Sequence, residues 1–124
     1  MQNLRHQSLV AWQRADDLFI TLHKMSLQSF PAFERFELGS QLRKAAYSVP
    51  ANIAEGYGRR HIKERLHFLS IAQASLAEVG YCIHVASRLG YICAEMLSTL
   101  ERDQNGVGSP LAGLIRSVSS SSGC

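Results

Sequence analysis

Apolar residues recur at steps of three and four positions in four separate segments of this chain. That spacing places side chains along one face of an α-helix. The segments cover about residues 9–28, 35–56, 62–89 and 94–118. No stretch of useful length alternates apolar and polar residues as a half-buried strand does. Because the connections are short, the pattern predicts an all-α fold: an antiparallel up-and-down four-helix bundle, formed as one domain by residues 1–118.

The second segment contains a proline within its apolar stripe. The spacing runs on without interruption from Val49, before Pro50, to Ile53, after it. A proline inside a helix removes one backbone hydrogen bond and costs about 3 kcal/mol. The pattern therefore predicts a helix kinked at Pro50 rather than ended there. We expect Gly56 to adopt the left-handed conformation that follows a helix end, and Gly58 to loosen the corner that leads to the third helix.

The fourth segment contains the sequence NGVGSP, which by composition is typical of a loop. The apolar spacing nevertheless holds through it, from Leu100 to Val107 and Leu111. A loop gives no reason for that regularity, so we predict one helix over 94–118, weakened between Gly106 and Pro110. The last six residues, SSSSGC at 119–124, are expected to form a disordered tail.

Composition narrows the classes of protein that need to be considered. The chain has 124 residues, of which 46% are hydrophobic and 19% charged, as in ordinary soluble proteins. It has no run of eighteen apolar residues and no apolar core in the opening MQNLRHQSL, so we expect no membrane span, no signal peptide and a cytoplasmic location. Three cysteines and five histidines lack the spacing of a zinc or disulfide framework, so no metal and no cofactor is expected.

The surplus of positive charge is confined to one part of the chain. The formal net charge is +3. The window from residue 43 to residue 65 holds six basic and two acidic residues, whereas the rest of the chain holds seven basic and eight acidic. Cations gathered on one surface attract nucleic-acid phosphates. The predicted nucleic-acid-binding residues are Arg43, Lys44, Arg59, Arg60, Lys63 and Arg65. The alternative is that arginines after a helix end only offset the helix dipole, an effect of about 0.3–1 kcal/mol.

Acidic and amide residues near the same corner allow two interpretations. Asn52, Glu55, Glu64 and Glu78 are expected to form a structural polar network that fixes how the second and third helices meet. An acid–base site built on Glu55 and Glu78 is the alternative, but no nucleophile, histidine partner or phosphate loop accompanies them. We therefore expect no enzymatic activity. Phe68 and Tyr57 are expected at an oligomer interface, because Phe68 lies off the main apolar stripe of its helix.

Several stretches of the sequence resemble a known family. These are AWQRADDL near the start, FELGSQLRKAAYSVPANIAEGYGRR in the middle, KERLHFLSIAQASLAEV after it and LAGLIRSV near the end. They resemble the four-helix bundle proteins encoded by intervening sequences of bacterial 23S ribosomal RNA genes, over roughly residues 9 to 118. His61, where such proteins often open the third helix with serine or threonine, departs from the pattern. So does the helix-breaking stretch from Gly106 to Pro110.

The resemblance implies an antiparallel four-helix bundle that assembles into a ring-shaped homopentamer. It also implies a fold similar to that of the accessory protein of diversity-generating retroelements, a basic pentamer that binds nucleic acid and a reverse transcriptase. Neither group has an attached enzymatic activity. Our hypothesis is a non-enzymatic, homo-oligomeric bundle that binds nucleic acid, RNA or RNA–DNA, by backbone contacts. The alternative is a protein-interaction scaffold, for example an accessory subunit of a reverse transcriptase or other nucleic-acid enzyme.

Overall fold

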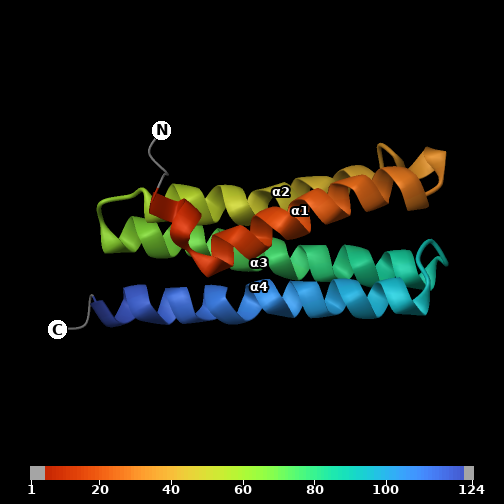
Figure 1. The fold of residues 1–124 in the computed structure, drawn as a ribbon. Helices are drawn as coiled ribbons and strands as arrows, with labels where there is room; N and C mark the ends of the chain where they lie inside the picture. Colours follow the sequence, from red (N-terminus) through yellow and green to blue (C-terminus); the bar gives the residue numbers. More distant parts are fainter. Residues whose placement is uncertain (1–4, 122–124) are drawn as a thin grey trace.

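The computed structural model describes residues 5–121, and within them the chain forms four long helices. These are α1 (Val10–Ser29), α2 (Leu38–Tyr57), α3 (Ile62–Arg88) and α4 (Ala94–Ser121), with short 3-10 helices η1 (Arg5–Ser8) and η2 (Ala32–Glu34). Each long helix packs against the next, and α4 packs back against α1 (Figure 1). The predicted all-α four-helix bundle is confirmed.

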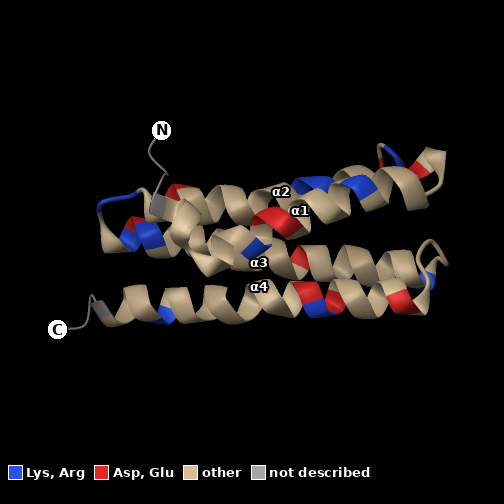
Figure 2. Ribbon diagram, in the orientation of Figure 1, with Lys and Arg blue, Asp and Glu red and all other residues tan. Residues whose placement is uncertain are grey.

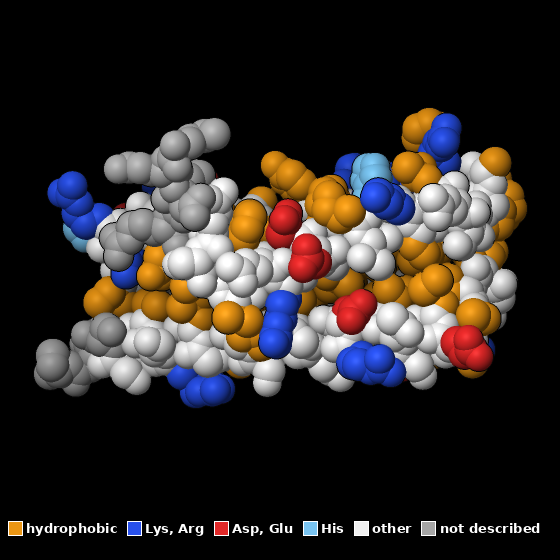
Figure 3. Space-filling model, in the orientation of Figure 1, with side chains coloured by type: hydrophobic (Ala, Val, Ile, Leu, Met, Phe, Trp, Pro, Cys, Tyr) orange, Lys and Arg blue, Asp and Glu red, His pale blue; other side chains and the backbone are white. Residues whose placement is uncertain are grey.

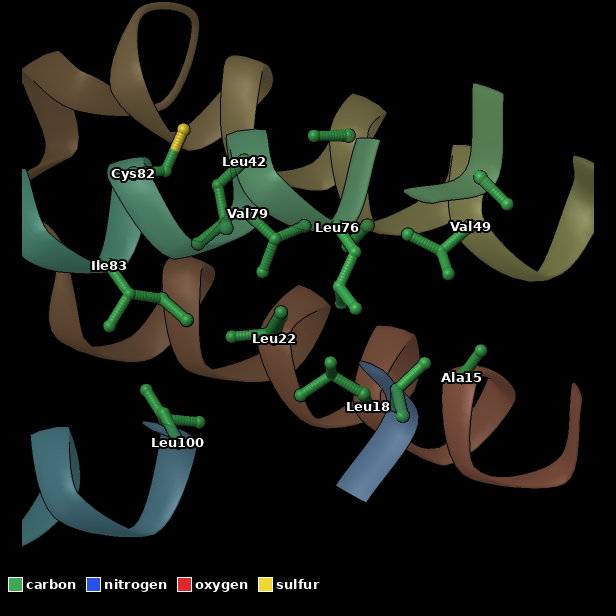
Figure 4. Packing of buried hydrophobic residues seen from close by; sticks show 14 of the residues in the cluster. Ala15, Leu18, Leu22, Leu42, Val49, Leu76, Val79, Cys82, Ile83 and Leu100 are labelled. Atoms are coloured by element: carbon green, nitrogen blue, oxygen red, sulfur yellow. The ribbon is translucent and has the colours of Figure 1, made fainter. Parts of the chain in front are cut away.

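The apolar stripes of all four helices meet in one continuous core. Leu22 of α1, Leu42 of α2 and Leu100 of α4 are fully buried, and Ile83 of α3 is nearly so. Their side chains point toward one another between the helices (Figure 4). Removing these side chains from water is the main force that holds the bundle together.

The start and the interior of α2 differ from expectation in part. Residues 32–34 form η2, and α2 begins at Leu38, where the backbone N–H lies 3.3 Å from Glu34 Oε1. The helix then continues through Pro50, which is buried. Continuity through the proline matches the prediction, while the kink at Pro50 stays a prediction.

The expected role of Gly56 is wrong. This residue lies inside α2 and is buried, and within residues 5–121 Gly90 (φ 80°) is the glycine with a positive φ. A Cβ added to Gly56 would lie 3.1 Å from the carbonyl oxygen of Arg65 and 3.1 Å from Cβ of Phe68. Glycine is therefore needed here because α2 and α3 approach closely, not because the chain turns.

The loop-like stretch of α4 is helical, as the apolar spacing predicted. Pro110 has no N–H, so the carbonyl of Gly106 loses its donor within the helix. Arg14 of α1 replaces it, with Nη1 donating to that carbonyl at 3.0 Å. The helix runs on to Ser121, so residues 119–121 are helical rather than part of the expected tail. Residues 122–124 lie outside the described residues.

Replacing Gly106 with alanine is expected to stabilise the bundle by about 1 kcal/mol. Alanine is favoured over glycine by roughly that amount in a helix interior. Apart from the backbone of its own helix, no described atom lies within 4 Å of an added Cβ, and the bond from Arg14 uses only the backbone of residue 106. Urea unfolding followed by circular dichroism measures the effect. A loss of stability would show that residue 106 is not in a regular helix.

A polar clamp joins the two turns at the end of the bundle where α1 leads into α2. The hydroxyl of Tyr91, before α4, donates to Glu34 Oε2 at 2.7 Å. The ring of Tyr91 also contacts that of Phe30, at 5.5 Å between centroids. The hydrogen bond to Glu34 is the first cause of a raised pKa for Tyr91, because ionisation would remove the proton that Tyr91 donates; burial and the negative charge of Glu34 act in the same direction.

α3 is long and apolar enough, by length and composition, to cross a membrane. The core helix of a soluble bundle meets the same criterion, and Leu69, Val79 and Ile83 of α3 are buried against the other helices. The expected lack of a membrane span stays a prediction.

Candidate nucleic-acid interface

The turn between α2 and α3 brings four cationic residues together. Arg59 and Arg60 lie in the turn, and Lys63 and Arg65 lie in the first turns of α3. We call these four residues the corner cluster. The turn is closed by backbone bonds from Gly58 N–H to the carbonyl of Ala54 and from Arg59 N–H to the carbonyl of Gly56. In Figure 3 basic side chains protrude at this end of the molecule, on the left.

Arg59 is the most heavily engaged member of the corner cluster. Its Nη2 lies 2.8 Å from Glu55 Oε2, and its Nη1 lies 3.6 Å from Glu64 Oε2. Its guanidinium carbon lies 4.8 Å from the centre of the Phe68 ring. The side chain is 40% exposed, so each ion pair contributes at most about 1 kcal/mol. The two carboxylates nevertheless reduce the charge that Arg59 presents to a ligand.

The other three cations are less constrained. Arg60 and Lys63 are exposed, and neither makes an ion pair with any described residue. Arg65 is half-buried: its Nε donates to the carbonyl of Arg59 at 2.7 Å, and its guanidinium lies 5.9 Å from the centre of the Tyr57 ring. That hydrogen bond uses Nε and does not involve the two terminal nitrogens of the guanidinium. Positive charge at the corner is therefore offered mainly by Arg60, Lys63 and Arg65.

The expected participation of Arg43 and Lys44 at this corner is wrong. Arg43 precedes the end of α2 by 14 residues, which is roughly 21 Å along a helix. Figure 2 shows these blue positions on α2 toward the α1–α2 connection, far from the α2–α3 turn. Arg43 is also used structurally: it donates to Ser26 Oγ at 2.9 Å and to the carbonyl of Arg35 at 2.6 Å. The basic residues of the window 43–65 therefore lie in two places: Arg43 and Lys44 near the start of α2, and the corner cluster after its end.

A cavity of about 430 Å³ opens beside the corner cluster. Its walls come from η1, from the last turn of α2, from the turn to α3 and from the first turn of α3. The lining residues are His6, Ala54, Tyr57, Gly58, Arg59, Arg60 and Arg65. Three guanidinium groups and an imidazole thus face one hollow, and no carboxylate is among these residues. Sequence reasoning missed His6, because nothing in the pattern shows that the segment before α1 folds back onto this corner.

The predicted polar network is divided into separate parts. Asn52 Nδ2 donates to the carbonyl of Ser48 at 2.8 Å, and Ser75 Oγ lies 2.8 Å from Ser48 Oγ, which ties α2 to α3. Glu55 and Glu64 bind Arg59 instead, as described above. The network is therefore two local sets, and its serine members were not predicted.

Glu78 belongs to neither set. It lies beside Cys82 in a hollow of about 380 Å³ that is also lined by Glu37 and Leu38, near the start of α2. Glu55 is near the other end of α2, so the pairing of Glu55 with Glu78 on which the enzyme alternative depended is not assembled. Burial, followed by the charge of Glu78, raises the pKa of the Cys82 thiol, which keeps it protonated and a poor nucleophile at neutral pH.

Two strongly exposed aromatic side chains were not identified from the sequence. Phe33 and Phe36 lie between α1 and α2 and are 73% and 83% exposed. Both fall outside the helical stripes, which is the signal that would have identified them. Phe68 and Tyr57, predicted at an oligomer interface, are half-buried beside Arg59 and Arg65 respectively, and their interface role stays a prediction.

Comparison with known proteins supplies a family. A model of the 23S rRNA-intervening sequence protein family matches residues 7–113, which include α1, α2, α3 and the whole corner cluster. No curated protein matches the chain. A crystal structure of a protein with unknown function from the S23 ribosomal protein family of Bacteroides thetaiotaomicron VPI-5482 is similar, with 19% identity and a TM-score of 0.80. That match covers 86% of this chain and 96% of the other, and at this identity it shows the fold alone. The extent of the family match settles the assignment: the chain belongs to the 23S rRNA-intervening sequence protein family.

Proposed function

We propose that this protein is a non-enzymatic, homo-oligomeric helical bundle that binds RNA or RNA–DNA through phosphate contacts at the α2–α3 corner. The observation that carries the proposal is the cavity lined by Arg59, Arg60 and Arg65 without a carboxylate among its lining residues. Guanidinium groups present paired N–H donors that match the oxygens of a phosphate.

The number of available cations limits the strength of the proposed contact. With Arg59 partly neutralised and Arg43 and Lys44 at the far end of α2, one protomer offers about three cations to phosphates. Such a contact is weak at physiological salt. Homo-oligomerisation, a ring of five being the arrangement that the family resemblance implies, would repeat the corner and let several weak contacts act on one strand.

The contact is expected to be independent of nucleotide sequence. The corner presents guanidinium and ammonium groups, which bind phosphate oxygens, and a single aromatic residue, Tyr57, lines the cavity. Base readout needs hydrogen bonds to base edges or a platform of several aromatic side chains. The affinity should therefore vary little among RNAs of equal length and charge.

Reversing the charge of the two most open cations is expected to weaken RNA binding by tenfold or more. In the double variant Arg60→Glu and Lys63→Glu, two attractive contacts become repulsive. Both side chains are exposed, so the fold should be retained. Fluorescence anisotropy with a labelled single-stranded RNA measures the affinity.

The matched control is Lys24→Glu with Lys44→Glu, two exposed lysines away from the corner and with the same change in net charge. This control should bind nearly as well as the unaltered protein. Equal losses in the two double variants would assign binding to net charge alone and would remove the corner as the site.

A protein-interaction scaffold is the second candidate, and Phe33 with Phe36 favours it. Aromatic side chains are enriched at protein–protein interfaces, and these two are the most exposed of the large hydrophobic residues described. In this candidate the bundle serves as an accessory subunit of a reverse transcriptase or other nucleic-acid enzyme. A pull-down from nuclease-treated lysate tests it: one specific protein should persist after the treatment and be lost with Phe33→Ser and Phe36→Ser. Loss of all partners on nuclease treatment would exclude the scaffold.

A further inference from the structure

The corner cavity has the composition of a site for one concentrated negative charge rather than for a long strand. Three arginines line it. His6, which lies in η1 before α1, lines it as well. Its volume of about 430 Å³ lies within the range of roughly 300–1,000 Å³ that is typical of small-ligand pockets. The carboxylates nearest to it, those of Glu55 and Glu64, are both held by Arg59.

One donor at this site lacks an acceptor. Nε of Arg59 is buried, and no described residue accepts its hydrogen bond. Buried donors are nearly always paired, and a charged one without a partner is destabilising. The neighbouring Arg65 donates from its own Nε to the backbone carbonyl of Arg59, which fixes the Arg65 side chain against the turn, and both residues line the cavity. The groups left to meet an anion oxygen in the cavity are the guanidinium of the exposed Arg60 and the terminal nitrogens of Arg65.

Along α2, the described side chains do not continue the positive charge of the cavity. Lys63 is the one further member of the corner cluster, and the next basic residues on α2, Lys44 and Arg43, are more than ten residues away along the helix. Between them and the cavity, Glu55 is the charged side chain of α2. A strand laid along α2 would therefore lose its cationic partners after one or two phosphates.

We propose that this cavity binds a terminal phosphate monoester, as carried by the 5′ end of an RNA strand. A monoester has about −1.5 to −2 charges at neutral pH and three terminal oxygens, whereas a phosphate within the strand has one charge and two such oxygens. Clustered guanidinium forks bind the more highly charged group more tightly. The proposal deepens the proposed function and rests on it for the strand, while the same chemistry would also accept a free nucleoside monophosphate.

The test compares two RNAs that differ only at their 5′ end. A ten-nucleotide oligouridylate with a 3′ fluorophore is prepared with a 5′-phosphate and with a 5′-hydroxyl, and fluorescence anisotropy gives both affinities at one salt concentration. The full-length protein is expected to prefer the 5′-phosphate by about tenfold. In Arg60→Gln the preference should fall close to one. Lys44→Gln, with the same change of charge on an exposed residue of α2, should keep it.

Two further measurements make each failure distinguishable. Arg65→Lys retains the charge but lacks the fork, so it should also reduce the preference, and circular dichroism checks that each variant is folded. Equal affinity of the unaltered protein for both RNAs would overturn the terminal-phosphate inference and leave the proposed function standing. A preference that survived in Arg60→Gln would overturn the assignment to this cavity.

Uridine 5′-monophosphate and uridine, compared by thermal shift, separate the cavity from the strand. A rise in melting temperature with the monophosphate alone, lost in Arg60→Gln, would support the cavity even if neither RNA bound, and would then contradict the proposed function. No shift with the monophosphate and no binding of either RNA would overturn both.

Discussion

Replacing Leu22 with alanine is expected to lower the free energy of unfolding by about 3 kcal/mol. Leu22 is 0% exposed and belongs to the core cluster to which α2, α3 and α4 also contribute (Figure 4). Truncation of such a side chain loses its transfer free energy and leaves a cavity that the surrounding helices only partly fill, at a total cost of about 2–5 kcal/mol. Alanine is a better helix former than leucine, so the loss cannot come from the backbone.

Ile20 supplies the matched control for this measurement. It is on the same helix, two positions away, and is 45% exposed. Ile20→Ala should cost well under half as much as Leu22→Ala in urea unfolding followed by circular dichroism. Equal costs would mean that the inner and outer faces of α1 are assigned wrongly.

Replacing Gly56 with leucine is expected to destabilise the bundle by about 2 kcal/mol or more and to disturb the corner. The new side chain would enter the contact between α2 and α3, where a Cβ alone lies 3.1 Å from a backbone oxygen of α3. Overpacking of this kind costs about 1–3 kcal/mol, and a backbone oxygen cannot move aside as a side chain does. Leucine gains close to 1 kcal/mol in helix propensity over glycine, so the measured loss understates the crowding.

Gly106→Leu is the control, because no described atom outside the backbone of α4 lies within 4 Å of a Cβ built at that position. It should leave stability unchanged or raised. Since Gly56 contacts Arg65 and Phe68, the Gly56 variant should also lose affinity for RNA while still folded at low temperature. A Gly56→Leu protein as stable as the original would show that α2 and α3 do not approach closely at this corner.

The fold was predictable because the apolar stripe is a property of each helix alone. The continuity of α4 through Gly106 and Pro110 followed from the spacing of Leu100, Val107 and Leu111, although the local composition favoured a loop. What supports it, the hydrogen bond from Arg14 to Gly106, depends on a neighbouring helix and could not be found from one segment.

The candidate site was only partly predictable. Arg59, Arg60 and Arg65 were identified from charge, and they do line one cavity. The error over Arg43 and Lys44 came from treating a stretch of sequence as a surface. Sixteen residues from Arg43 to Arg59 are mostly helix, which separates the charges by more than 20 Å. His6 and the buried Arg59 Nε depend on how η1 and Phe68 pack, and no local pattern gives that.

The glycines show the same limit. Gly90, just after the end of α3, adopts the left-handed conformation that the sequence analysis expected of Gly56. The local sequence around Gly56 also suggested a helix end, yet Gly56 lies inside α2 and allows α2 and α3 to approach closely. Only the position of α3 distinguishes these roles, and that is a tertiary property.

The dependence of RNA affinity on salt tests the central claim most directly. With the mass of the particle determined in the same buffers, binding of a labelled single-stranded RNA is measured at several salt concentrations between about 50 and 300 mM. With three cations per protomer, the logarithm of the association constant should fall against the logarithm of the salt concentration with a slope of about −2 for each protomer engaged. The double variant Arg60→Glu and Lys63→Glu should remove most of this slope. A slope near zero, or one unchanged in that variant, would contradict a phosphate-binding corner.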